Sequence, residues 1–153
     1  MRVSIIGGGT VPDEQARIAE EAGRLLAERG HDLVCGGLGG IMEAACRGAK
    51  EGRDANGTGG KTIGLLPGED RRAANPYVDV PIATGLGHAR NALVVMNGDA
   101  VIAIDGGVGT LSEVGFAGIY DRPIAGLETH DAPGVEVVTT PADAVAYVEA
   151  AVE

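Results

Sequence analysis

The chain has 153 residues, of which 44% are apolar, enough for one folded domain with its own hydrophobic core. Its formal net charge of −10 excludes the basic face that a nucleic-acid-binding protein needs. No apolar run reaches the roughly 20 residues of a membrane span, and Met1 leads into a strand-like segment rather than a signal peptide. We expect a single domain over residues 1–153 in the cytoplasm, without a nucleic-acid or membrane partner.

The surface is expected to be acidic and poor in lysine. The 22 acidic residues outnumber the 12 basic ones, and the only lysines are Lys50 and Lys61. An acidic, lysine-poor surface remains solvated at high salt, so we hypothesise a halophilic source.

The first half of the chain alternates between short apolar runs and amphipathic segments. Residues 2–6 predict a buried strand, and a glycine turn then leads into a helix with Thr10 as its N-cap and Gly30 at its end. Strands are predicted at residues 32–35 and 62–66, with a helix from Ile41 to about Gly52 between them. Polar loops are expected at residues 54–60 and 69–76.

The second half continues the alternation. A strand at residues 78–82 contains Pro81, which suits an edge, and a helix covers residues 88–96. The run 100–104 is apolar throughout, which is typical of a strand buried on both faces. The last predicted elements are a helix at residues 111–120, strands at 123–127 and 135–138, and a helix opening at Thr140. The alternation predicts an α/β, three-layer, Rossmann-like fold with a doubly wound, mostly parallel sheet in one domain.

Three glycine clusters point to the binding site, at residues 7–9, 36–40 and 106–109. Each lies between a predicted strand and a helix, where an open α/β sheet binds its ligand. Glycine permits close approach of the backbone, and a helix start offers free N–H groups to an anion. The sequence therefore predicts a phosphate-bearing small-molecule ligand. The full phosphate loop of nucleoside triphosphatases, Gly-x-x-x-x-Gly-Lys-Ser/Thr, is absent from the sequence, and the first cluster lacks the full dinucleotide fingerprint.

Two charged residues near these clusters each allow two interpretations. Thr110 and Glu113 have the spacing of a capping box, in which Glu113 binds the helix start. Alternatively, the Glu113 carboxylate holds ribose hydroxyls or activates water. Arg90 is either a solvated surface residue or a bidentate phosphate ligand.

The two cysteines, Cys35 and Cys46, have neither the spacing of a metal site nor that of a disulfide framework. We expect reduced, buried thiols, although Cys35 ends a strand beside the second glycine cluster and is also a candidate for the pocket wall. No metal site is predicted.

Three segments together resemble the superfamily often labelled lysine decarboxylase-like. They are VCGGLGGIME at residues 34–43, Arg90-Asn91, and GGVGTLSE at residues 106–113. This superfamily includes the lonely-guy cytokinin-activating phosphoribohydrolases and the molybdenum-cofactor carrier proteins. The resemblance implies a Rossmann-like fold, a nucleotide-type phosphate site and a homodimer or tetramer. True lysine decarboxylation is rejected, because it needs a pyridoxal phosphate Schiff-base lysine and neither Lys50 nor Lys61 lies in such a motif.

The hydrolase motifs of this superfamily are matched in part. Gly106, Gly107, Gly109, Thr110, Glu113, His88 and Arg90 match, and the resemblance implies that Glu113 and Arg90 are the catalytic pair of a hydrolase. Asp105 replaces proline, Gly87 methionine, Asn91 lysine and Ser112 the first of two glutamates. These departures resemble the carrier-like branch. We therefore predict binding of a nucleotide-type or pterin-cofactor phosphate, such as the molybdenum cofactor, with no further cofactor required. The alternative is hydrolysis of nucleoside 5′-monophosphates to base and ribose 5-phosphate.

The predicted binding residues combine the glycine loops with the residues that the resemblance adds. They are Gly8, Gly9, Gly37, Gly39, Arg90, Asn91, Gly106, Gly107, Val108, Gly109, Thr110 and Glu113. A small-residue face on the helix after the third cluster, formed by Gly115, Ala117 and Gly118, suits close packing against a second chain as well as against its own sheet.

Overall fold

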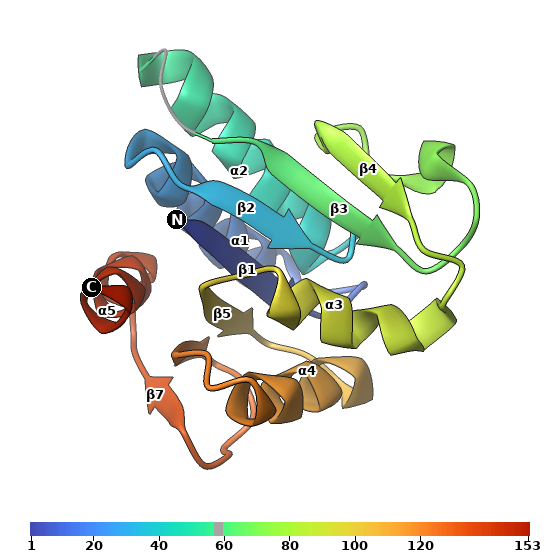
Figure 1. Ribbon diagram of the computed structural model, residues 1–153. Helices are drawn as coiled ribbons and strands as arrows, with labels where there is room; N and C mark the ends of the chain where they lie inside the picture. The colour runs from blue at the N-terminus through green and yellow to red at the C-terminus, as the bar shows by residue number, and fades with distance from the viewer. Residues whose placement is uncertain (57–59) are drawn as a thin grey trace.

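A computed structural model describes residues 1–56 and 60–153 (Figure 1). In these residues seven strands form one sheet in the order β4-β3-β2-β1-β5-β6-β7, and every pairing is parallel. The strands are β1 (Arg2–Gly7), β2 (Asp32–Cys35), β3 (Thr62–Leu66), β4 (Val80–Ala83), β5 (Ala100–Ile104), β6 (Ile124–Leu127) and β7 (Val135–Val137). Pro81 lies in an edge strand and all five residues of β5 are buried, as the sequence predicts.

Helices cover both faces of the sheet. They are α1 (Asp13–Glu28), α2 (Ile41–Asn56), α3 (Asn91–Met96), α4 (Val108–Ile119) and α5 (Pro141–Val152), with 3₁₀ turns η1 (Arg71–Ala73) and η2 (Gly87–Arg90). Helices α1, α2 and α5 share one apolar core with strand residues such as Ile5 and Ile102. Helices α3 and α4 share a second core with their strand neighbours, Ile6 and Val101. Successive strand residues point to opposite faces, so each strand contributes to both cores. A parallel sheet between two layers of helices confirms the predicted three-layer, Rossmann-like α/β fold.

The chain order reverses beside β1, which fixes where a ligand can bind. The chain moves outward from β1 to β4, returns to place β5 on the other side of β1, and moves outward again to β7. Gly7 at the end of β1 is paired with Ile104 at the end of β5. The loops after these two strands turn to opposite faces and leave a crevice at the carboxyl edge.

Several predicted element boundaries are wrong. Helix α1 follows Pro12, not Thr10, and no side chain caps it in the described chain. The proline ring fixes φ near the helical value and has no N–H that needs an acceptor. Helix α2 continues past Gly52 to Asn56. A Cβ on Gly52 would lie 2.4 Å from the Arg24 carbonyl oxygen, so this glycine permits close packing of α2 on α1 rather than ending the helix.

Smaller differences concern the loops. Residues 54–56 of the predicted 54–60 loop belong to helix α2, and residues 57–59 lie outside the described residues. The predicted 69–76 loop contains the turn η1. Within the described parts of the chain, no helix is both long and apolar enough to cross a membrane.

Candidate functional site

A cavity of about 370 Å³ opens at the carboxyl ends of β1, β2 and β5. All three glycine clusters contribute to its wall, together with the turn η2 and helix α4. Its lining residues are Ile5, Ile6, Gly7, Gly8, Gly9, Gly36, Leu38, Met42, Pro67, Gly87, His88, Arg90, Asn91, Gly107, Gly109, Thr110 and Glu113. Segments that are distant in sequence thus converge at the reversal point of the sheet.

The amino end of α4 faces this cavity. Gly107 is the N-cap, and no side chain of the described residues accepts a hydrogen bond from the first turn. The N–H groups of a first helical turn have no partner within the helix and carry a partial positive charge. This end of α4 can therefore bind an anion.

The chain just ahead of α4 is held in a fixed shape. Asp105 has φ of 52°, in the left-handed region that is costly for a residue other than glycine. The Thr129 hydroxyl donates to the Asp105 carbonyl at 2.7 Å, and His130 Nε2 lies 2.9 Å from the Gly107 carbonyl oxygen. These contacts from the loop after β6 hold the turn that orients the helix entrance.

Arg90 is buried, with 7% of its surface exposed, at the end of η2. Its Nε donates to the Leu65 carbonyl at 2.8 Å, and Nη2 donates to the Gly36 carbonyl at 3.3 Å. Its Nη1 donates to the side-chain oxygen of Asn91. Within the described chain Arg90 has no ion-pair partner. Burial lowers the pKa of the guanidinium, against the opposing charge of Glu113. A buried positive charge with neutral hydrogen-bond partners favours an anionic ligand.

Glu113 is also buried, with 8% exposed, and faces the same cavity from α4. Burial raises the pKa of its carboxyl to about 8, although the charge of Arg90 lowers it. The predicted capping box is wrong: α4 begins at Val108, so Thr110 lies within the helix rather than at its N-cap. Glu113 is thus a carboxyl of the cavity wall, and at neutral pH it holds a proton that it can donate to a ligand.

A chain of hydrogen bonds connects Arg90 to the first turn of α4. Asn91 accepts from Arg90 through Oδ1, and its Nδ2 donates to the Ser112 hydroxyl at 3.2 Å. The Ser112 hydroxyl donates in turn to the Gly109 carbonyl at 2.6 Å. Arg90 and the amino end of α4 are therefore held in one relative position.

The apolar wall of the cavity comes from Leu38, Met42 and Pro67. The Leu38 loop is tied to the segment between β3 and β4, because Asn75 donates from its backbone to Gly37 at 2.9 Å and from its side chain to the Leu38 carbonyl at 2.9 Å.

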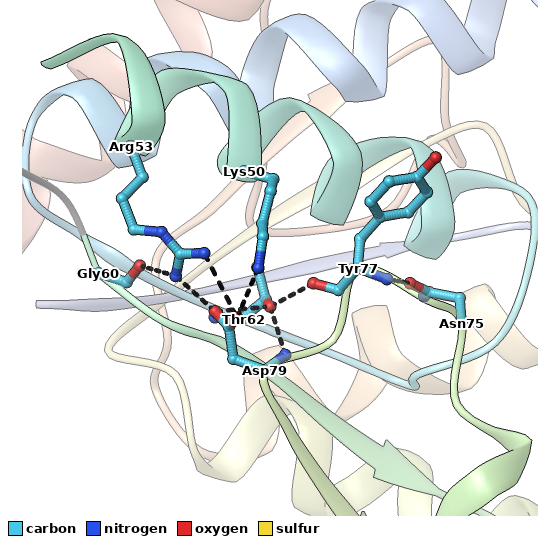
Figure 2. A network of polar contacts seen from close by, with 7 residues as sticks. All are labelled: Lys50, Arg53, Gly60, Thr62, Asn75, Tyr77 and Asp79. Atoms are coloured by element: carbon cyan, nitrogen blue, oxygen red, sulfur yellow. Dashed lines mark hydrogen bonds and ion pairs between the residues drawn. The ribbon is translucent and has the colours of Figure 1, made fainter. Parts of the chain in front are cut away.

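The segment after Asn75 is anchored by the carboxylate of Asp79 (Figure 2). This carboxylate accepts from Arg53 at 2.6 Å and from Lys50 at 3.1 Å, both on α2. It also accepts from the backbone N–H of Thr62 at 3.0 Å. Burial opposes ionisation of Asp79, but these donors outweigh it and hold the pKa of the carboxyl well below its usual range. The network fixes the β3–β4 connection against α2.

Comparison with known proteins places the chain in a family. The model of the SLOG cluster4 family matches residues 1–153. The chain belongs to the SLOG cluster4 family. A protein of Archaeoglobus fulgidus without a described function is 40% identical over 148 residues, 96% of this chain and 93% of that protein. A cytokinin riboside 5′-monophosphate phosphoribohydrolase of Mycobacterium tuberculosis is 34% identical over 124 residues, 72% of this chain and 61% of the hydrolase.

Solved structures of other proteins are similar to this SLOG chain over nearly its whole length. The molybdenum cofactor binding protein of Rippkaea orientalis has a TM-score of 0.90 at 31% identity, covering 99% of this chain and 97% of that one. The molybdenum cofactor carrier protein of Chlamydomonas reinhardtii has a TM-score of 0.83 at 33% identity, covering 97% and 96%. The predicted resemblance to the lonely-guy and carrier-like branch is confirmed.

The SLOG fold brings most of the sequence-predicted binding residues into one cavity. Those that line it are Gly8, Gly9, Arg90, Asn91, Gly107, Gly109, Thr110 and Glu113. Gly37, Gly39, Gly106 and Val108 do not line it. A Cβ on Gly37 would meet Leu66 and Gly64, and one on Gly39 would lie 3.4 Å from the Gly9 carbonyl oxygen. A Cβ on Gly106 would meet Thr110. Val108 is 85% exposed.

Sequence reasoning missed the apolar wall and the contact of Gly36 with the site. Met42 lies at a helical core spacing in the sequence, so nothing in the pattern distinguishes it from a packing residue. Gly36 was within a predicted cluster but was not singled out. A Cβ there would lie 2.8 Å from Arg90 Nη2, so glycine is required for the close approach of Arg90.

The cysteines are both buried and are not bonded to each other, as expected. Neither lines the cavity. In the described residues no group of three or more histidine, cysteine or acidic side chains could hold a metal ion.

Proposed function

We propose that this chain binds a small molecule through a phosphate group at the carboxyl edge of its sheet. The observation that carries the proposal is the presence of buried Arg90 and the uncapped end of α4 in one cavity. The helix end offers N–H donors and Arg90 offers a full charge, and a phosphate can accept from both.

We propose that the remainder of the ligand is a planar ring, as in a nucleotide or the pterin of the molybdenum cofactor. Leu38, Met42 and Pro67 supply an apolar wall beside the polar end of the cavity. A volume of about 370 Å³ lies within the range of small-molecule sites. The molybdenum cofactor would be cargo of this chain, as the names of the similar carrier proteins suggest, and not a group needed for its fold.

Calorimetric titration tests this proposal. Adenosine monophosphate and the molybdenum cofactor are titrated into the chain, with adenosine as the control that lacks the phosphate. We expect saturable heat with at least one phosphorylated ligand and at least about tenfold weaker binding of adenosine, which corresponds to the loss of one charge-assisted contact of about 1.4 kcal/mol. Equal binding of adenosine and its monophosphate, or no heat with any of the phosphorylated compounds, would exclude the proposal.

The alternative function is hydrolysis of nucleoside 5′-monophosphates. The observation that favours it is the buried Glu113 carboxyl, whose pKa of about 8 lies near physiological pH. In the ionised form Glu113 would stabilise the oxocarbenium-like charge that develops as the bond from base to ribose breaks, while Arg90 holds the phosphate. Incubation with adenosine monophosphate should then release free adenine, and Glu113→Gln should abolish the release. Release that survives this substitution would contradict the role of Glu113.

We also propose that the chain forms a homodimer or tetramer through the outward face of α4. Leu111 is 46% and Ile119 69% exposed on this face, and a Cβ on Gly115 or Gly118 would meet nothing within 4 Å. Ala117, the third residue of the predicted small-residue face, is instead buried in the core beneath α4. Exposed apolar residues beside such open backbone suit contact with another chain. Sedimentation of the wild type as a larger species, and of Ile119→Arg as a monomer, would support this assembly; a monomeric wild type would exclude it.

We also propose that the chain is cytoplasmic and that its source is halophilic. The halophilic source is inferred from the excess of acidic over basic residues in the sequence. Stability that increases from dilute buffer to molar salt would support it, and full stability in dilute buffer would contradict it.

A further inference from the structure

Two thiols lie in contact beneath the second glycine loop. Cys35 ends β2 and Cys46 lies on α2, and their sulfur atoms are 3.6 Å apart. Both side chains are fully buried and neither forms a disulfide. The loop that begins with Gly36 separates Cys35 from the cavity by one residue. This pair of nucleophilic groups has no part in phosphate binding as proposed above.

The sulfur of Cys35 is surrounded by groups that stabilise a thiolate. The pKa of Cys35 is lowered by a hydrogen bond from the Cys46 thiol, against the effect of burial. The Gly37 N–H, which donates to Cys35 Sγ at 3.3 Å, and the charge of Arg90 lower it further. The same contact and burial raise the pKa of Cys46. Cys35 is therefore the nucleophile of the pair and Cys46 its proton-bearing neighbour.

The thiol pair belongs to a ring of contacts that shapes the pocket loop. Cys35 accepts from Gly37, and Gly37 in turn accepts from the Asn75 backbone. The Asn75 side chain donates to the Leu38 carbonyl, and it also acts on the neighbouring Cys46 thiol, whose pKa it lowers against the larger opposing effects. The ring closes through the contact between the two sulfur atoms. Movement of either sulfur therefore acts on the loop that carries Gly36 and Leu38.

We propose that Cys35 and Cys46 form a redox-active pair that closes to an intramolecular disulfide, and that this oxidation weakens ligand binding in the adjacent cavity. The second half of this inference rests on the proposed phosphate-binding function. The first half rests only on the geometry of the two thiols.

The chemistry needs one two-electron oxidant, for which a peroxide suffices. The Cys35 thiolate attacks one oxygen of hydrogen peroxide, takes up OH as a sulfenic acid and, with one proton, releases water. The Cys46 sulfur then attacks the sulfenic sulfur, loses its proton, and a second water leaves as the S–S bond forms. In sum, two thiols and one peroxide give one disulfide and two waters.

Bond formation requires the sulfur atoms to approach from 3.6 Å to about 2.0 Å. This movement, and the conversion of the Cys35 thiol to a disulfide sulfur, disrupt the hydrogen bond from the Gly37 N–H. An unpaired buried N–H is unfavourable, so the loop must shift to find another partner. Gly36, whose carbonyl accepts from Arg90, lies directly between Cys35 and Gly37. The shift therefore displaces the contact that positions the anion-binding arginine.

The experiment compares reduced and peroxide-treated chain. Intact mass under denaturing conditions and a thiol count report the disulfide, and titration with adenosine monophosphate reports the cavity. Cys46→Ala is the matched control, because Cys46 does not line the cavity, and Cys46→Ser replaces it should the alanine variant fail to fold.

We expect the treated wild type to lose two hydrogens in mass and both free thiols. It should bind adenosine monophosphate about tenfold more weakly, a change typical of coupled sites. Dithiothreitol should restore both the thiols and the affinity. Each control variant is compared with its own reduced form, and it should show neither a disulfide nor a loss of affinity under the same treatment. Persistence of both thiols in folded wild type would overturn the inference. A disulfide with unchanged affinity would overturn its second half. Failure of the reduced chain to bind any phosphorylated ligand would instead contradict the proposed function. The mass shift would still show whether the two cysteines form a disulfide.

Discussion

The side-chain amide of Asn91 donates a hydrogen bond to the Ser112 hydroxyl at 3.2 Å. These are two of the positions at which the chain departs from the hydrolase motifs, which carry lysine and glutamate there. The lysine–glutamate pair of the motif is thus replaced here by two neutral side chains in direct contact. Among the described residues that line the cavity, Glu113 is then the only acidic residue. The change favours a site that holds an anionic ligand over one built with two carboxylates.

A double-mutant cycle at this pair should show strong coupling. Asn91→Lys alone places a second cation beside Arg90, and Ser112→Glu alone places a second carboxylate beside Glu113, so each should lower the free energy of unfolding. Together the two new charges neutralise each other, and we expect a favourable coupling energy of about 1–3 kcal/mol. Urea unfolding of the four chains measures it. Simple additivity would show that the two positions do not interact as the hydrogen bond indicates.

The pH dependence of stability should report the buried carboxyl of Glu113. Its pKa is about 8 in the folded chain, against 4.5 for an ordinary glutamate, so between these values the folded chain binds one more proton than the unfolded chain. The free energy of unfolding should therefore fall with rising pH across this window, by up to about 1.4 kcal/mol per unit. Glu113→Gln removes this contribution and should become progressively more stable than wild type from about pH 5 to about pH 8 in denaturant titrations. Parallel profiles for the two chains would contradict the raised pKa.

The alternation of apolar runs with amphipathic segments was enough to predict the order of every strand and every α-helix. Residues 100–104, apolar throughout, indicated an interior strand buried on both faces, and Pro81 indicated an edge strand. The sequence could not show that Gly52 allows close helix packing rather than ending α2. It also could not show that α4 begins at Val108, because the serine, threonine and glutamate that follow fit a capping box equally well.

The sequence predicted the position of the glycine loops in the site better than the environment of its charged residues. Because the sheet is parallel, glycine clusters that lie between a strand and the next helix meet at its carboxyl edge. Whether Arg90 is exposed or buried depends on the carbonyl groups of Leu65 on β3 and of Gly36 just after β2, both distant from Arg90 in sequence. The apolar wall is formed because Met42 and Pro67 face the cavity. The local sequence pattern does not distinguish these residues from residues of the core.

Removal of the Asp79 carboxylate should loosen the segment behind the pocket loop. Asp79→Asn removes the carboxylate that Arg53 and Lys50 share (Figure 2) and should lower the free energy of unfolding by about 2 kcal/mol at neutral pH. Since the folded pKa of Asp79 is lowered, this contribution is present above its ordinary value of 3.8 and lost as the pH falls below it. The difference between wild type and variant should therefore shrink in acid. Asp70→Asn, which removes an exposed pair with Arg72, is the control and should remain close to wild type. An equally small effect of both substitutions would show that the Asp79 network does not stabilise the fold.

Substitution of Gly36 should act on binding through Arg90. In Gly36→Ala the new methyl group would lie 2.8 Å from Arg90 Nη2 and from Met42 Sδ, so both side chains must move. We expect affinity for adenosine monophosphate to fall about tenfold, the effect of one weakened charged hydrogen bond. Gly68→Ala, where a Cβ meets nothing within 4 Å, should bind as wild type does. Equal affinities of the two variants would mean that the position of Arg90 does not matter to the ligand.

The most direct test of phosphate binding is the affinity of Arg90 variants for adenosine monophosphate, measured by calorimetry on chains whose folding is confirmed by thermal unfolding. Arg90→Lys keeps the charge but not the planar set of donors, whereas Arg90→Met keeps neither. The account predicts affinity losses of about tenfold for lysine and about a hundredfold for methionine, with adenosine unaffected. An Arg90→Met chain that folds and binds the monophosphate as tightly as wild type would contradict it.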